Sequence, residues 1–98
     1  MYKQLFFLHK TEDEKALSHF KEFIAPHLSE IAGKKIKIAK VESNLLLETK
    51  YSYFCEMSFE SEQKMNESMN SKPGRKLNEA LRDFHKLITI ISINYNFE

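Results

Sequence analysis

The sequence contains few of the residues that mark cross-linked, metal-rich or membrane-spanning proteins. It has a single cysteine, Cys55, and no tryptophan among its 98 residues. One cysteine cannot form an internal disulfide, so we expect a reducing, cytoplasmic setting. Its apolar runs are far shorter than the roughly 20 residues that a membrane-spanning helix needs, and we expect no membrane partner.

An excess of charge of one sign is also missing. Lys and Arg number 15 against 14 Asp and Glu, so the formal net charge is only +1. The two signs alternate along the chain and do not form a basic stripe. We therefore expect no nucleic-acid partner.

The first half of the chain carries a strand pattern followed by a helix pattern. Residues 2–9 are bulky and apolar on both alternating faces, which is typical of a central strand covered on both sides. Thr11 and Glu14 have the spacing of a capping box, which predicts a helix start. Apolar residues then recur at helical spacing as far as Gly33, a natural helix stop. Pro26 predicts a kink or a fresh start within that helix.

The second half repeats the strand and helix patterns. Residues 35–42 predict a strand with one solvated side near a sheet edge, and residues 51–59 predict the third strand. Ser61 can cap a helix that Pro73-Gly74 interrupts. The β-branched residues of 87–97 predict a closing strand.

This order of elements predicts an α+β fold, with residues 1–98 forming one domain. Two strand-helix-strand units with right-handed crossovers give a ferredoxin-like, four-stranded antiparallel sheet with both helices on one face. The third strand would then direct Cys55 and Met57 to one face and Phe54 and Glu56 to the other.

The second face of this sheet needs a cover. In a monomer it would expose Phe54 together with one face of the first strand, a larger apolar patch than isolated domains normally show. Three leucines in 44–47 add apolar surface between the second and third strands. We therefore predict a homodimer that joins the two sheet faces.

Several segments resemble the EthD-like members of the dimeric α/β-barrel superfamily. Residues 56–61, Glu-Met-Ser-Phe-Glu-Ser, are similar to the family's strand end, where a Glu and a Phe precede a Ser or Asp that opens a helix. Residues 69–75, Met-Asn-Ser-Lys-Pro-Gly-Arg, are similar to its next segment, with a Gly between two short helices. Pro26 with Gly33 resembles the pattern that closes the first helix.

The resemblance implies a dimer whose facing sheets enclose a pocket in each subunit. Family members bind or transform small molecules, which are often aromatic or polyketide-like. Many relatives carry a His two residues before the proline of the first helix, where this chain has Ile24. His27, one residue after Pro26, does not inherit that role.

Glu56 is the candidate for acid-base chemistry. A carboxylate in mid-strand beside Phe54, under a partner sheet, would be partly removed from water, which suits a general acid or base. The alternative is structural, because Glu56 can instead pair with a neighbouring Lys or across the dimer.

The ligand-binding candidates lie on three strands. One face of the first strand carries a polar group among apolar ones, which is typical of a small-molecule pocket. The candidates are Gln4, Phe6 and Leu8 from that strand, Phe54 from the third and Ser92 from the last. The opposite face of the first strand, with Leu5, Phe7 and His9, remains the alternative.

Metal and cofactor sites are not predicted. The four histidines lack the i, i+4 or Cys/His spacing of metal ligands. His85 suggests a haem-binding, monooxygenase-like protein as a remote alternative, but such relatives also use a Trp, which this chain lacks. An RNA-recognition module would need Gly and basic residues in its third strand, where Glu56 stands.

The function that these observations favour is the binding of a small apolar or aromatic metabolite between the sheets of a homodimer. Cofactor-free acid-base chemistry would be an extension of that function. The alternative from another class is a dimeric structural or regulatory module without turnover.

Overall fold

The computed structural model describes residues 1–42 and 49–95. The leucines in 44–47 that were predicted to join the dimer interface lie outside this part. The elements follow one another as β1 (Tyr2–His9), α1 (Glu14–His19), η1 (Phe20–Ile24), α2 (Ala25–Ala32), β2 (Ala39–Lys40), β3 (Tyr51–Phe59), α3 (Glu62–Met69), α4 (Lys72–Arg82), η2 (His85–Leu87) and β4 (Ile88–Asn94).

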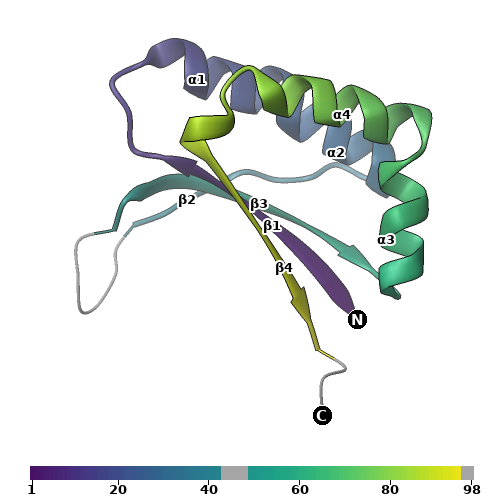
Figure 1. The fold of residues 1–98 in the computed structure, drawn as a ribbon. Helices are drawn as coiled ribbons and strands as arrows, with labels where there is room; N and C mark the ends of the chain where they lie inside the picture. Colours follow the sequence, from purple (N-terminus) through teal and green to yellow (C-terminus); the bar gives the residue numbers. More distant parts are fainter. Residues whose placement is uncertain (43–48, 96–98) are drawn as a thin grey trace.

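The four strands form one antiparallel sheet in the order β2-β3-β1-β4. The first strand is therefore central, as its two apolar faces predicted. All the longer helices lie on one side of the sheet, and among residues 1–42 and 49–95 no helix covers its other side (Figure 1). This arrangement confirms the predicted α+β, ferredoxin-like fold.

The core lies between the sheet and the helices. Alternate side chains of β1 and β3 point into it and meet the apolar stripes of the helices. Burial of each large apolar side chain stabilises the fold by about 1.5–3 kcal/mol. The largest fully buried side chains are Phe6, Phe20, Leu8, Ile24, Leu28, Met57, Leu77 and Cys55.

The first helical segment begins later than the capping box predicted. Asp13 caps α1, because its Oδ1 accepts the N–H of Lys15 at 3.0 Å, whereas Thr11 accepts the N–H of Asp13. A π-helical turn, η1, precedes Pro26, and the N–H of Ala25 donates to the carbonyl of Phe20. Pro26 has no N–H to continue the α-helical ladder, so the predicted fresh start is confirmed here.

The end of α2 is set by glycine. Gly33 adopts a left-handed backbone conformation with φ of 70°. Residues that carry a Cβ rarely adopt this conformation. The predicted helix stop is confirmed.

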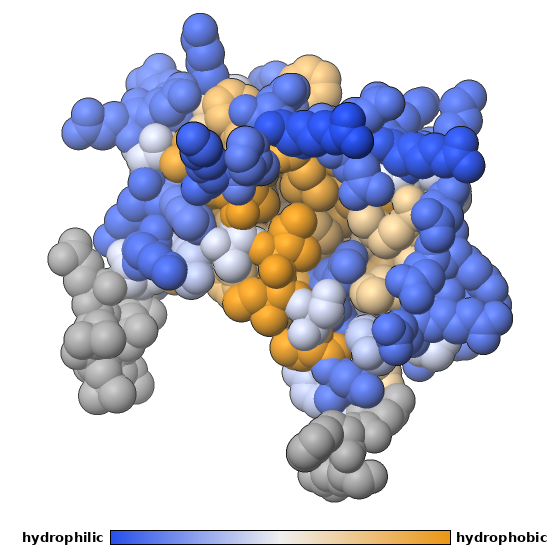
Figure 2. Space-filling model, in the orientation of Figure 1, coloured by the Kyte–Doolittle hydropathy of each residue, from blue (hydrophilic) through white to orange (hydrophobic). Residues whose placement is uncertain are grey.

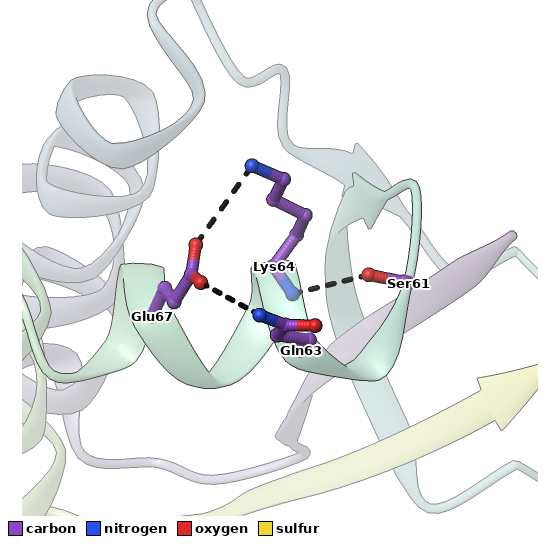
Figure 3. A network of polar contacts seen from close by, with 4 residues as sticks. All are labelled: Ser61, Gln63, Lys64 and Glu67. Atoms are coloured by element: carbon purple, nitrogen blue, oxygen red, sulfur yellow. Dashed lines mark hydrogen bonds and ion pairs between the residues drawn. The ribbon is translucent and has the colours of Figure 1, made fainter.

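The second helical segment consists of two helices separated at residues 70–71. Ser61 caps α3, because its hydroxyl accepts the N–H of Lys64 at 3.2 Å. One turn later along the helix, the Glu67 carboxylate contacts the side chains of Gln63 and Lys64 (Figure 3). Ser71 caps α4 in the same way.

Gly74 lies inside the first turn of α4 and allows α3 and α4 to meet. A Cβ at this position would collide with the carbonyl oxygens of Ser68 and Met69 at the end of α3. The close approach of the two helices therefore depends on a residue without a side chain.

The second strand is much shorter than predicted. Within the described part of the predicted strand, Ala39 and Lys40 pair with β3, the N–H of Val41 donates to the Ser52 carbonyl at 2.8 Å, and residues 34–38 form no strand. The N–H of Ile36 donates to the Ser29 hydroxyl on α2 at 2.9 Å, so the chain here follows the helix and not the sheet. The alternation correctly predicted that Ile36 faces the core. Its backbone, however, does not belong to the hydrogen-bonded ladder of the sheet.

Candidate functional site

The side of the sheet without helices, called the open face below, carries the two site residues predicted from β3. Phe54 lies opposite Phe7 of β1, and Glu56 lies opposite Leu5. Directly opposed residues of an antiparallel pair point to the same side, so these four side chains share the open face.

The remaining predicted ligand contacts lie on the other side of the sheet. Phe6 and Leu8 are completely buried in the core against the helices. Gln4 belongs to the same alternation and lies opposite Ser92 of β4. The choice of strand face made from the sequence is thus corrected: β1 presents Leu5 and its alternates to the open face.

Gln4 shows an unusual feature at this corrected position. Its side-chain oxygen is buried without a hydrogen-bond partner among the described residues. A buried acceptor without a donor is a cost to folding, and it lies on the helix-facing side, away from the hollow described next.

A hollow of about 350 Å³ lies on the open face. Its volume is near the lower end of the range of small-molecule pockets, about 300–1,000 Å³. Phe54 and Glu56 are the predicted residues that it includes. Its lining residues come from all four strands and their ends and are Leu5, Phe7, Ala39, Lys40, Val41, Phe54, Glu56, Ile93 and Tyr95.

Aromatic rings form one wall of this face. Phe7 stacks on Tyr51 with ring centroids 4.6 Å apart and contacts Phe54 at 5.0 Å. The pairing of β1 with β3 shifts between Leu8 and His9, so His9 lies opposite Tyr51. Strict alternation along β3 would place Tyr51 on the helix-facing side with Tyr53 and Cys55, so this irregularity brings the Tyr51 ring onto the open face.

Glu56 is the acidic group of the hollow, and it has a cationic partner. Lys3 Nζ lies 3.5 Å from Glu56 Oε1. The same ammonium lies 5.8 Å from the centroid of the Tyr95 ring. The carboxylate side chain is 42% exposed in the single chain, so water still reaches it until something covers the face.

A second polar pair lies at the far end of β1. His9 Nε2 is 2.5 Å from the hydroxyl oxygen of Thr89, and the His9 ring contacts Tyr51. Neither His9 nor Thr89 lines the hollow. Sequence reasoning named His9 within the alternative face and among the four histidines without metal-ligand spacing. It could not pair His9 with Thr89, because the position of Thr89 beside β1 depends on the register of β4.

The other histidines with a defined contact belong to the helical layer. His19 hydrogen-bonds the Ala80 carbonyl at 2.6 Å, and His85 Nδ1 lies 3.2 Å from the Arg82 carbonyl. His85, the residue of the haem alternative, is exposed on η2. Within residues 1–42 and 49–95, no cluster of three His, Cys, Asp or Glu side chains is arranged to hold a metal ion.

A larger groove lies on the helical side, between α2 and residues 35–38. Its volume is about 680 Å³, and Pro26, Ile36 and Ile38 line it together with exposed lysines. No carboxylate or histidine lines this groove. It therefore lacks the groups that most often act as a general acid or base, one of which, Glu56, lies on the open face.

Comparisons with known proteins support the architecture. An ethyl tert-butyl ether D (EthD) family protein from Bacillus halodurans matches with a TM-score of 0.79 and 23% identity, covering 96% of this chain and 97% of that chain. This chain shares its fold. The resemblance to EthD-like proteins is therefore confirmed at the level of the fold.

Two further structures match over nearly their whole length. A hydroxynitrile lyase from Passiflora edulis has a TM-score of 0.63 at 16% identity, covering 99% of this chain and 96% of that chain. A dimeric protein of unknown function with a ferredoxin-like fold from Bacteroides fragilis has a TM-score of 0.57 at 12% identity, with coverages of 96% and 95%. At these identities the likeness concerns the fold.

Comparison by sequence adds no closer relation. No protein-family model matches the chain, and no curated protein shows significant similarity to it. In the parts of the chain that the structure describes, no helix combines the length and the apolar character that a membrane crossing requires.

Proposed function

We propose that this protein binds a small apolar or aromatic molecule in the hollow of the open face. The observation that carries the proposal is the combination of an apolar, aromatic-lined hollow with a single carboxylate, Glu56, beside it. Such pockets place a few polar groups among mostly apolar walls, which is the usual composition of a small-molecule site.

We further propose that a second copy of the chain covers this face. Phe7 and Phe54 lie on it half-buried, and Ile91 and Tyr95 are 40% and 60% exposed. Apolar surface of this kind marks an interaction site more often than a free surface. The protein from Bacteroides fragilis with the same fold is described as dimeric, which supports a homodimer here.

Acid-base chemistry is an extension of this proposal. Glu56 is the carboxylate that would face a bound molecule, and a cover over the open face would remove it from water. One protein of this fold is a hydroxynitrile lyase and another is a putative antibiotic biosynthesis monooxygenase. The fold therefore accommodates enzymes, and Glu56 is the residue to test for turnover.

A dimeric module without a ligand is the second candidate. It is favoured by the direct contacts among Phe7, Tyr51 and Phe54, because these rings fill part of the face themselves. In that case the same surface would pack against its copy and leave no room for a small molecule.

A blocked variant distinguishes the two candidates. Ala39 lies opposite Phe54 in the sheet and lines the hollow, so Ala39→Trp would place an indole in the binding space. The control is Ser18→Trp at an exposed position of α1. Binding of one- and two-ring aromatic compounds, naphthalene and 2-naphthol among them, is followed by two-dimensional NMR of the labelled protein.

The expected result is a set of shift changes at the amides of Leu5, Phe54 and Ile93. Ala39→Trp should weaken binding at least about tenfold, a loss of about 1.4 kcal/mol, while Ser18→Trp binds as the natural sequence does. If no compound shifts these amides although light scattering shows a dimer, the module without a ligand replaces the small-molecule proposal.

A further inference from the structure

The polar side chains that line the hollow are few. Among the residues that line it, Glu56 is the one carboxylate and Tyr95 supplies a phenol ring. Lys40 lies opposite Tyr53 in the sheet, and that register directs its side chain to the helix-facing side. The hollow therefore presents the Glu56 carboxylate to a bound molecule as a hydrogen-bond acceptor.

Lys3 is the counter-ion of this acceptor. Its ammonium lies 3.5 Å from Glu56 Oε1, and it is the donor that the described residues supply to this carboxylate. An ionised carboxylate has about four lone-pair positions, so Oε2 retains the capacity to accept. The pair as a whole carries no net charge, because one ammonium balances one carboxylate.

Covering the open face makes the unused acceptor positions costly. A carboxylate oxygen that is buried without a hydrogen-bond donor loses its hydration. This loss costs free energy that an exposed carboxylate oxygen, which keeps its water, does not lose. A bound molecule with an O–H group would supply the missing donor. An anion would meet the negative charge of Glu56, and a cation would compete with Lys3, which is already in place as counter-ion.

We propose that the hollow selects neutral aromatic molecules that carry a hydroxyl group, which donates to Glu56. Lys3 acts as a positioning residue that holds the carboxylate and excludes cations by supplying the balancing charge. This inference rests on the proposed function, since it names the class of molecule that the same hollow binds.

Three probes with the same two-ring body test the selection. They are 2-naphthol, which donates a hydrogen bond, 2-methoxynaphthalene, which cannot, and 2-naphthylmethylammonium, which is a cation. With the full-length protein, 2-naphthol should bind about tenfold more tightly than the ether, as expected for a hydrogen bond to a charged group. It should also bind more tightly than the ammonium compound.

Two variants identify the residues responsible. Glu56→Leu should bind 2-naphthol and the ether with equal affinity. Lys3→Met should reverse the preference for neutral molecules, because the ammonium probe then replaces the missing counter-ion at Glu56. Lys15→Met, at an exposed position of α1, is the matched control and should retain the preferences of the natural sequence.

The outcomes distinguish the selection of a hydroxyl group from the proposed binding of small molecules in the hollow. Equal affinities for 2-naphthol and the ether in the natural sequence would overturn the hydroxyl selection while leaving the aromatic site intact. An unchanged preference in Lys3→Met would overturn the role of Lys3. Failure of all three probes to bind would overturn both this inference and the proposed function.

Discussion

The two faces of the sheet have similar side chains but very different surroundings. On the helix-facing side, Phe6 and Leu8 are at most 1% exposed. On the open face, the neighbouring Phe7 and Leu5 remain partly exposed, and Ile91 is 40% exposed. Both faces of β1 are equally apolar, so the helices and not the side chains determine which face becomes the core.

The difference indicates which face is available for function. Apolar side chains that already pack against helices are occupied with stabilising the fold. The open face keeps the same kind of surface without a second layer, and it adds a charged pair, Lys3 and Glu56. Hydrophobic surface also continues along β4, as the middle of the view in Figure 2 shows.

The largest effect should come from truncating matched rings on the two faces. Phe6→Ala removes a fully buried ring and should lower the free energy of unfolding by about 3–5 kcal/mol. Phe7→Ala removes its neighbour on the open face and should cost less than half of that at concentrations where the chain is monomeric. Denaturant unfolding at low and high protein concentration measures both values.

A loss for Phe7→Ala as large as that for Phe6→Ala in the monomer would contradict the distinction between the faces. A loss that appears only at high concentration would instead locate Phe7 in a contact between copies, as the proposed homodimer requires.

A smaller effect should come from Cys55, which lies on the helix-facing side. Burial raises the pKa of the Cys55 thiol from its ordinary value of 9.0 to about 12. The folded protein therefore keeps the thiol protonated while the unfolded chain ionises above pH 9, so stability is fully present below pH 9 and is lost as the pH rises toward 12. At pH 10 the loss should be about 1.4 kcal/mol.

Cys55→Ala provides the comparison for this effect. It lacks the thiol and should lose less stability than the natural sequence between pH 8 and pH 10, measured by denaturant unfolding at each pH. The same pH dependence in both proteins would show that Cys55 ionises as readily when folded as when unfolded.

The order of elements and the open face could be predicted from the sequence because they depend on local patterns. Alternation in 51–59 correctly separated Cys55 and Met57 from Phe54 and Glu56. The face of β1 could not be chosen, because Phe6 and Phe7 are equally bulky and each face carries polar residues, with Gln4 on one and Lys3 and His9 on the other. Its assignment depends on the register with β3, which is a contact between distant parts of the chain.

The hollow itself could be predicted only in part. Glu56 and Phe54 were named, but Ala39, Ile93 and Tyr95 join them through the pairing of both edge strands. The length of β2 was overestimated because Ile36 alternates like a strand residue while its N–H bonds to Ser29 on α2. Periodicity reports which side chains are buried, not which partner the backbone chooses.

The smallest effect, and one of opposite sign, should come from Gln4. Its buried side-chain oxygen has no donor among the described residues, so Gln4→Met removes an unsatisfied acceptor while keeping a flexible side chain of similar length. The free energy of unfolding should rise by about 1 kcal/mol. Thr89→Val, which removes the hydroxyl that His9 contacts on the open face, is a matched control and should destabilise. If Gln4→Met also destabilises, the oxygen is satisfied in solution, by water or by a bound molecule, and the helix-facing side would contain a polar site of its own.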